Sequence, residues 1–260
     1  MKPVINDDPS TMRIIQLTDL HIGQEGEDTY GVDVRQNFLQ ILEKAKAQQP
    51  DLLVISGDLC FDDGNAEVYS WIKTQLDRAK IPYEIMSGNH DDPTLMARVF
   101  GREELLHGKE LYFQREYEGR TVLFLDTTTY QMSEAQLDWL KEALAQIKGT
   151  ALVFMHHPPL PSGVPFMDSK HHLRNMDAVQ EVFFAYPHPV QVFTGHYHVE
   201  KVVQQRNLTV YITPSCFFQI GQRSKEFEVD HYRIALRTID WNNGIMMNAV
   251  HYLDESHSAV

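Results

Sequence analysis

Short apolar runs alternate with amphipathic segments over the first two thirds of the chain, which is typical of strands connected by helices. The first run, residues 13–18, predicts a buried strand, and apolar residues at helical spacing predict a helix over residues 33–48. Ser133 followed by Gln136 resembles a capping box at a helix start. We predict further strands over residues 52–56, 83–86, 111–117, 121–125, 151–155 and 190–194, and helices over residues 66–79, from 93, over 133–147 and over 176–185.

The last quarter of the chain has an antiparallel pattern, with Asn242-Asn243-Gly244 as a hairpin turn signal. The strands after residue 224 are expected at an edge of a second sheet. Because the chain has no internal repeat or linker, residues 1–260 are expected to form one domain, with a lead-in over residues 1–11 and a tail over 254–260. Strands with short turns are predicted over residues 201–205, 208–213, 234–241 and 245–253.

The composition narrows the classes of function. The chain has 23 Lys and Arg against 36 Asp and Glu, and this net charge of −13 disfavours nucleic acid and anionic membranes as partners. Two cysteines cannot form a disulfide framework, and the first residues do not resemble a signal peptide. No apolar run approaches the ~18 residues of a membrane span, so a cytoplasmic location is expected.

Oxygen and imidazole side chains follow five of the predicted strands. Because the carboxyl ends of parallel strands meet at one edge of a sheet, these side chains are expected to converge. A glycine before three of them allows a sharp turn without a Cβ clash. The side chains are Asp19 with His21, Asp58, Asn89 with His90, His156, and His196 with His198.

Carboxylate, amide and imidazole donors without thiolates suit Mn, Fe, Zn or Co. Six or seven such ligands exceed what one tetrahedral ion takes, and Asp58 is the best candidate to bridge two ions about 3.5–4 Å apart. Each motif alone is explained equally well by a turn or a core histidine. Their joint occurrence at five strand ends favours a dinuclear metal site.

The sequence with these motifs resembles the calcineurin-like metallophosphoesterases, from about residue 13 to 253. Within that superfamily it is most similar to the class III 3′,5′-cyclic-AMP phosphodiesterases, on HHPPLP at 156–161, HLRN at 172–175 and TPS at 213–215. The motifs that carry the resemblance, with no ligand replaced, are Asp19-x-His21, Gly57-Asp58, Gly88-Asn89-His90-Asp91, His156 and Gly195-His196-x-His198.

The resemblance implies a four-layer α/β/β/α sandwich of two mixed sheets flanked by helices, with two divalent ions per chain. It also implies that His90 is a catalytic residue beside the substrate phosphate, which Asn89 contacts as well. The implied ligands are Asp19, His21, Asp58 and His198 for one ion, and Asp58, Asn89, His156 and His196 for the other.

The implied reaction is hydrolysis of a phosphodiester, 3′,5′-cyclic AMP to 5′-AMP, by a hydroxide that bridges the metals. Because a metal site recognises only phosphate, a glycerophosphodiesterase or a broad-specificity phosphodiester and monoester hydrolase is the alternative. A non-catalytic scaffold on the same fold is a more remote one. The loops over residues 23–32, 60–65 and 160–175 are expected to decide the substrate. The resemblance leaves a homodimer open.

Several side chains near the motifs allow two interpretations. His157 contacts substrate or supports a neighbouring ligand, and Arg174 contacts substrate or forms a surface ion pair. Asp91 orients the preceding histidine or caps the following helix. Phe217 and Phe218 stack on a base or belong to the core.

Overall fold

The structure is a computed structural model that describes residues 11–242 and 244–253. The predicted lead-in, apart from residue 11, and the predicted tail lie outside the described residues. One domain over residues 1–260 therefore stays a prediction.

The first of two large sheets has five strands in the order β15-β14-β1-β2-β3. β1 (Met12–Leu17), β2 (Leu52–Ser56) and β3 (Tyr83–Met86) are parallel, as helical connections require. β14 (Ala235–Asn242) pairs antiparallel with β1 and with β15 (Ile245–Tyr252). The last strands thus lie at a sheet edge as expected, but they extend the sheet of β1. The apolar pattern of β14 predicts burial and does not specify the partner strand.

The second sheet has six strands in the order β10-β11-β9-β8-β7-β6. Its four central strands are parallel, and the two edge strands run antiparallel to their neighbours. The strands are β6 (Phe113–Tyr117), β7 (Arg120–Leu125), β8 (Ala151–Met155), β9 (Val190–Thr194), β10 (Lys201–Gln205) and β11 (Leu208–Ile212).

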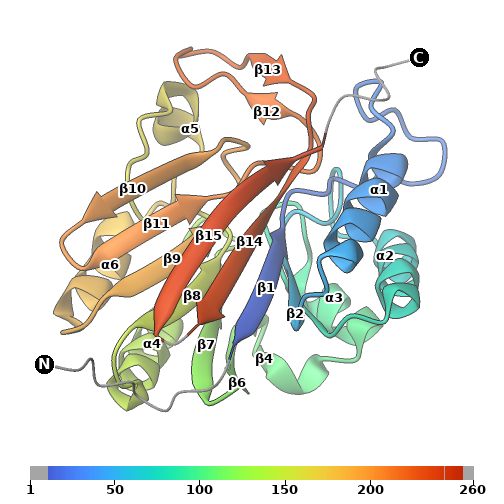
Figure 1. Cartoon of the computed structure of the whole chain (residues 1–260). Coiled ribbons are helices and arrows are strands. Elements are labelled where there is room, and N and C mark those ends of the chain that lie inside the picture. Colours follow the sequence, from blue (N-terminus) through green and yellow to red (C-terminus); the bar gives the residue numbers. More distant parts are fainter. Residues whose placement is uncertain (1–10, 243, 254–260) are drawn as a thin grey trace, which may run out of the picture.

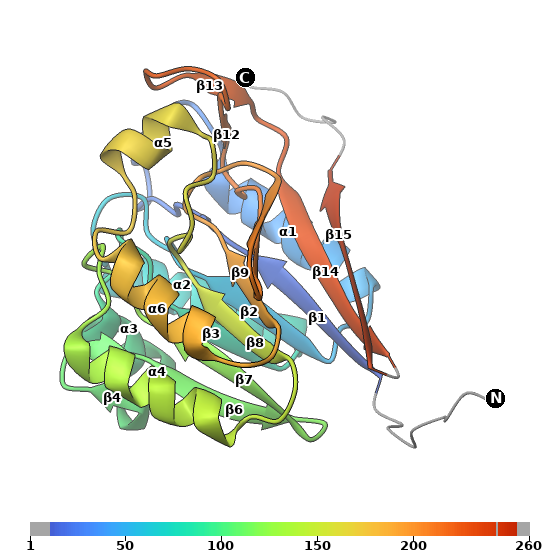
Figure 2. The same ribbon diagram turned by 90° about the vertical axis from the view of Figure 1, so that its left-hand side faces the viewer.

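Helices cover the outer faces of both sheets, which confirms the predicted four-layer α/β/β/α sandwich (Figures 1 and 2). The five-stranded sheet carries α1 (Val34–Ala47), α2 (Ala66–Ala79) and α3 (Pro93–Phe100). The six-stranded sheet carries α4 (Glu134–Gln146) and α6 (Met176–Ala185).

Short elements that the sequence pattern did not predict complete the fold. α5 (Pro165–Lys170) and the hairpin of β12 (Gln219–Ile220) and β13 (Val229–His231) lie at the top end of the sheets in Figure 1. A 3₁₀ helix (Glu103–Leu105) precedes β4 (Leu106–His107) and β5 (Glu110–Leu111). Residue 111, the first of the strand predicted over residues 111–117, belongs to β5. β6 therefore begins two residues later, at Phe113.

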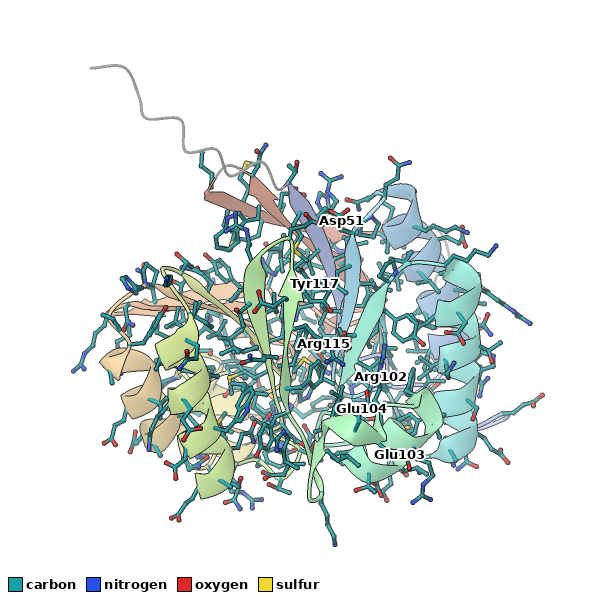
Figure 3. The ribbon with its side chains drawn as sticks, turned by 90° about the horizontal axis from the view of Figure 1, so that it is seen from below. Asp51, Arg102, Glu103, Glu104, Arg115 and Tyr117 are labelled. Atoms are coloured by element: carbon teal, nitrogen blue, oxygen red, sulfur yellow. The ribbon has the colours of Figure 1, made fainter. Side chains whose placement is uncertain are left out.

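The free edges of the two sheets are joined by a buried carboxylate. Glu84 of β3 accepts hydrogen bonds from Arg115 Nε at 3.3 Å and from Tyr117 Oη at 2.9 Å. Figure 3 labels Arg115 and Tyr117 on β6, where it runs beside β3. This contact holds the sheets together at the end of the molecule opposite α5 (Figures 1 and 3).

The capping box predicted at Ser133 is only half formed. Ser133 Oγ accepts a hydrogen bond from the backbone N–H of Gln136, as predicted. The Gln136 side chain does not return the bond to Ser133. It is buried and bonds both backbone groups of Asp126, accepting from the N–H and donating to the carbonyl oxygen, each at 2.8 Å. Those two backbone groups follow β7 and lie away from water. Leaving them unpaired would cost more stability than leaving the N–H of Ser133 unpaired, so the Gln136 side chain bonds them instead.

We expect Gln136→Met to lower the free energy of unfolding by about 1–3 kcal/mol, because it leaves buried backbone groups of Asp126 without partners. Urea unfolding followed by circular dichroism measures the change. Gln146→Met is the matched control, because Gln146 is exposed on the same helix and its replacement is expected to change stability by less than about 0.5 kcal/mol. Equal effects of both variants would contradict the structural role of Gln136.

Candidate metal centre

The loops after β1, β2, β3, β8 and β9 meet at one end of the two sheets, as predicted (Figure 1). Backbone hydrogen bonds join them within each sheet, from His21 N to Asp58 O at 3.0 Å and from Gly195 N to His156 O at 3.1 Å. A further bond crosses between the sheets, from His196 N to Asp19 Oδ2 at 3.0 Å. The side chains of both sheets therefore share one site.

Backbone strain is concentrated at this end of the sheets. A left-handed conformation is uncommon for residues other than glycine, and it costs of order 1–3 kcal/mol where the surrounding structure enforces it. Five predicted metal ligands adopt it: Asp19 (φ 54°), His21 (46°), Asp58 (50°), His196 (65°) and His198 (50°).

Two glycines are required by the close approach of these loops. Gly57 has φ 100°, and a Cβ there would lie 2.3 Å from His156 Nδ1. A Cβ on Gly88 would lie 2.2 Å from Asp58 Oδ1. The prediction that the glycines avoid a Cβ clash is confirmed, and the clash would be with the predicted ligands themselves.

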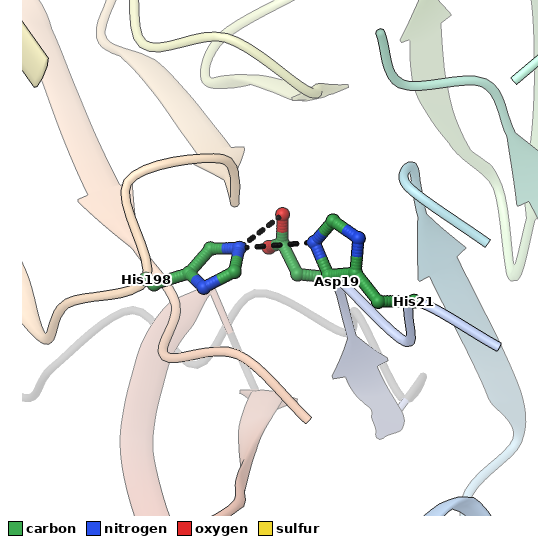
Figure 4. A group of neighbouring side chains, drawn as sticks. All are labelled: Asp19, His21 and His198. Atoms are coloured by element: carbon green, nitrogen blue, oxygen red, sulfur yellow. Dashed lines mark hydrogen bonds and ion pairs between the residues drawn. The ribbon is translucent and has the colours of Figure 1, made fainter. Parts of the chain in front are cut away.

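One cluster consists of Asp19, His21 and His198 (Figure 4). The Nε2 atoms of His21 and His198 face each other at 3.1 Å, and His198 Nε2 lies 3.3 Å from Asp19 Oδ1. Figure 4 shows the three side chains converging on one point from two different sheets. Two imidazole nitrogens and a carboxylate oxygen at this spacing can hold one cation.

A second cluster consists of Asp58, His156 and His196. His156 Nε2 lies 3.2 Å from Asp58 Oδ2, and the same oxygen lies 3.7 Å from His21 Nε2, so Asp58 stands between the two clusters. The Oδ1 atom of Asn89 is buried with no hydrogen-bond partner among the described residues. A buried amide oxygen without a partner is costly, and a cation would satisfy it.

The imidazoles are held in the orientation that metal ligands require. His156 Nδ1 bonds the carbonyl oxygen of Ser56 at 2.9 Å, and His198 Nδ1 bonds that of Phe218 at 2.9 Å. His196 uses Nε2 instead, at 2.8 Å from the carbonyl oxygen of His171. Because each ring donates one N–H to a backbone carbonyl oxygen, its other nitrogen can offer a lone pair to a cation.

The electrostatics of the site favour positive charge. Burial raises the pKa of Asp19, but attraction by His198 and His156 outweighs it and lowers the pKa to about 2. Burial likewise opposes ionisation of Asp58, and His156 overcomes it and lowers the pKa. Burial lowers the pKa values of His21 and His196 to about 3. At His156 burial also opposes a positive charge, but Asp58 and Asp19 outweigh it and raise the pKa to about 9, so without a cation this imidazole holds a proton that metal binding would release. Ionised carboxylates and the neutral imidazoles of His21 and His196 are already in the forms that bind metal, so the residues fit a pair of divalent ions.

Asp91 joins two of the ligand-bearing loops. Its carboxylate accepts hydrogen bonds from the backbone N–H groups of Leu59, Cys60 and Gly88 and from the hydroxyl of Tyr69. Burial, followed by repulsion from Asp58, raises the pKa of Asp91 to about 6. The alternative that Asp91 caps the next helix is wrong, because Asp92 caps α3 through the N–H of Leu95.

A cavity of about 440 Å³ opens beside the clusters. All three loops that were expected to decide the substrate contribute to its lining, with Tyr30, Phe61 and Phe166 among their residues. Phe217 and Phe218 are buried, which confirms that they belong to the core, and they also line the cavity, while their stacking on a base stays a prediction. Tyr30 and Phe166 were not predicted as site residues. Large aromatic residues within polar loops were the available signal.

Of the remaining predicted site residues, one lines the cavity and two do not. His90 lines the cavity and its Nδ1 lies 2.7 Å from the carbonyl oxygen of Asp62. His157 is buried behind His196, with ring centroids 4.1 Å apart, and is not among the cavity-lining residues. The Arg174 guanidinium lies 5.3 Å from the centre of the Tyr130 ring, also outside the lining. The substrate contacts of all three stay predictions.

The two-sheet fold, its clusters of side chains that can hold metal ions and the family match over residues 12–200 define a metal-dependent phosphoesterase. The chain belongs to the calcineurin-like phosphoesterase family, which it matches over residues 12–200. None of the described helices is both long enough and apolar enough to cross a membrane.

Two relatives align over most of the chain. A protein of Fibrobacter succinogenes, named a probable cyclic nucleotide phosphodiesterase, is 34% identical over 241 residues, with 93% of this chain and 94% of that protein covered. The 3′,5′-cyclic adenosine monophosphate phosphodiesterase CpdA of Haemophilus influenzae is 27% identical, with 92% and 86% covered.

Two solved structures share the fold. A dimetal phosphatase from Danio rerio superposes with a TM-score of 0.66 at 14% identity, covering 91% of this chain and 98% of that one. A purple acid phosphatase from yellow lupin has a TM-score of 0.63 at 15% identity, covering 90% and 50%.

We expect Asp91→Ala to lower the free energy of unfolding by about 3 kcal/mol or more, because buried donors from two loops lose their common acceptor at about 1–3 kcal/mol each. Asp91→Asn keeps one acceptor oxygen and should lose less. Chemical denaturation measures both changes, and Asp63→Ala, at an exposed carboxylate on a nearby loop, is the control. An Asp91→Ala variant as stable as the control would show that the bonds to Asp91 contribute little.

Proposed function

We propose that this protein hydrolyses 3′,5′-cyclic AMP to 5′-AMP. The observation that carries the proposal is the convergence of the predicted ligands from both sheets beside one cavity. The relatives from Fibrobacter and Haemophilus are named cyclic nucleotide phosphodiesterases, which favours this substrate class over other phosphate esters.

In this proposal the two clusters would hold two divalent ions, with Asp58 as a ligand shared by both. The position of Asp58 between His21 and His156 supports the bridging role. The buried Oδ1 atom of Asn89 has no hydrogen-bond partner among the described residues, which supports its role as a ligand of the second ion. The first ion is assigned Asp19, His21, Asp58 and His198, and the second Asp58, Asn89, His156 and His196.

When bound, two such ions supply a hydroxide nucleophile near neutral pH and neutralise phosphate oxygens. This neutralisation matters because the chain carries a net charge of −13, which repels an anionic substrate at long range. The protein's own contribution is a fixed geometry. The strained turns and buried hydrogen bonds hold the ligands in place before the substrate arrives.

His90 acts on the leaving group. Hydrolysis bonds a water oxygen to phosphorus and breaks the bond to the 3′ oxygen, which takes up a proton. Because His90 Nδ1 bonds the carbonyl oxygen of Asp62, Nε2 is the nitrogen available to the substrate. In its protonated form it stabilises the charge on phosphate or donates that proton. The ring of His90 lies 5.0 Å from that of His21, within reach of the first cluster.

The turnover panel described below also tests two alternative functions that the sequence leaves open. A glycerophosphodiesterase or broad-specificity hydrolase would use the same clusters, since they recognise phosphate alone. A non-catalytic scaffold has the least support, because no candidate ligand is replaced in the sequence and six of them lie in the two clusters. A homodimer, a cytoplasmic location and the exclusion of nucleic acid and membranes stay predictions.

A turnover panel tests the substrate. With Mn or Fe present, we expect kcat/KM for 3′,5′-cyclic AMP to exceed that for glycerophosphodiesters and p-nitrophenyl esters by about tenfold or more. This ratio equals a difference of about 1.4 kcal/mol in transition-state stabilisation. Cyclic GMP and 2′,3′-cyclic AMP complete the panel. A preference for glycerophosphodiesters would favour the first alternative, and no turnover with any metal would favour the scaffold.

His90→Ala is expected to lower kcat by about 10²–10⁴-fold while both metal ions stay bound, because the general acid is lost and the ligands remain. Steady-state kinetics and elemental analysis measure the two quantities. His188→Ala, at an exposed histidine outside the cavity lining, is the control. Loss of metal from His90→Ala would identify His90 as a ligand instead.

A further inference from the structure

Four aromatic rings form a continuous wall on one side of the cavity. Phe217 and Phe218 have ring centroids 4.3 Å apart, and Phe61 lies 6.0 Å from Phe217. Tyr30 completes the wall, 5.5 Å from Phe61 and 6.1 Å from Phe217, with its ring within 10° of parallel to that of Phe217. The wall is assembled from three segments that are far apart in the sequence.

The aromatic wall borders the metal clusters directly. The ring of Phe217 lies 5.2 Å from that of His21, and the ring of Phe218 lies 5.2 Å from that of His198. A group attached to a phosphate held at the clusters would therefore lie close to the wall. An aromatic wall at that distance offers stacking to a flat ring and few hydrogen bonds to a polyol such as glycerol.

Tyr30 is placed at the cavity mouth at an energetic cost. It is 68% exposed, and its backbone has φ 56°, which is a rare conformation for a bulky residue. The ring contacts Phe61 and Phe217 but stays largely exposed, so packing offsets only part of this cost. Strain of this kind is characteristic of residues that contact ligands.

The turn that carries Tyr30 is fixed by its own hydrogen bonds. Asp28 Oδ1 accepts from Gly31 N at 2.9 Å, and Thr29 bonds Val32 through both its hydroxyl and its carbonyl oxygen. Thr29 is buried although Tyr30 beside it is exposed. These bonds fix the backbone that carries Tyr30 before a ligand binds, which lowers the entropy cost of binding.

From this geometry we infer that the aromatic wall binds the nucleobase of the substrate and that Tyr30 is the outer stacking residue. The inference rests on the proposed function, and it adds that the base, beyond the phosphate, determines specificity. Stacking on an aromatic ring accepts any base, so cyclic GMP is expected to use the same wall.

The experiment compares two substrates that differ only in the base: 3′,5′-cyclic AMP and the 3′,5′-cyclic phosphate of methyl riboside. The measured quantity is the ratio of their kcat/KM values. We expect Tyr30→Ala to lower this ratio by about 5- to 150-fold, the range that stacking of one base on an aromatic ring covers. Tyr30→Phe keeps the ring and should restore the ratio to within about threefold.

Two further variants separate stacking from backbone effects. Tyr30→Asn also removes the ring, but asparagine tolerates the left-handed turn, so it should lower the ratio as much as Tyr30→Ala does. Tyr232→Ala is the matched control, because Tyr232 is 54% exposed and is not among the cavity-lining residues. Its ratio should equal that of the unaltered protein.

The outcomes distinguish failure of the inference from failure of the proposed function. If Tyr30→Ala lowers turnover of both substrates equally, or if Tyr30→Asn keeps the ratio, the stacking role is overturned while the proposed function stands. A loss of turnover that is confined to glycerophosphocholine as the substrate would show that the aromatic wall binds a quaternary ammonium group. That result would also overturn the stacking role. If the unaltered protein hydrolyses neither cyclic phosphate, the proposed function itself fails, and the inference with it.

Discussion

The structure depends on the burial of two ionised carboxylates next to each other. Asp19 and Asp58 are almost inaccessible to water, and an uncompensated buried carboxylate costs far more than the stability margin of a domain. Compensation comes from imidazoles and from backbone N–H groups. His196 N bonds Asp19 and His90 N bonds Asp58, each at 3.0 Å. Because the bond to Asp19 joins the two sheets, it favours the packing in which their ligand-bearing ends meet.

A buried polar network beneath the site fixes the same relation between the sheets. Gln16 of β1 donates to Ser56 Oγ and to the carbonyl oxygen of Thr194 in the other sheet, at 2.8 and 3.2 Å. It accepts from Thr213, whose hydroxyl in turn accepts from the buried guanidinium of Arg237 at 2.8 Å. Buried polar groups that are fully bonded stabilise one arrangement of the sheets over shifted ones.

Much of this was predictable from the sequence, because hydrophobic runs and their polar ends carry the information. The bounds of β2, α2, β3, β8, α6 and β9 match the predicted ranges, and the predicted ligands lie at the expected strand ends. Their individual roles as metal ligands stay predictions. α5 escaped prediction because it has six residues and no capping side chain. Gln136 was misassigned because its partners at Asp126 depend on tertiary packing, which local spacing does not encode. The partner strand of β14 and the contacts of Asp91 depend on long-range contacts in the same way.

Strand ends carry the candidate ligands and connecting segments carry much of the cavity lining, and this separation affects how such a protein can change in evolution. The candidate ligands lie at strand ends and are locked by the packing of both sheets, whereas Tyr30, Phe61 and Phe166 lie on connecting segments outside the two large sheets. Replacing those segments leaves the strand pairing intact. Evolution can therefore alter which ester is accepted by exchanging loops, while the hydrolytic chemistry is inherited unchanged.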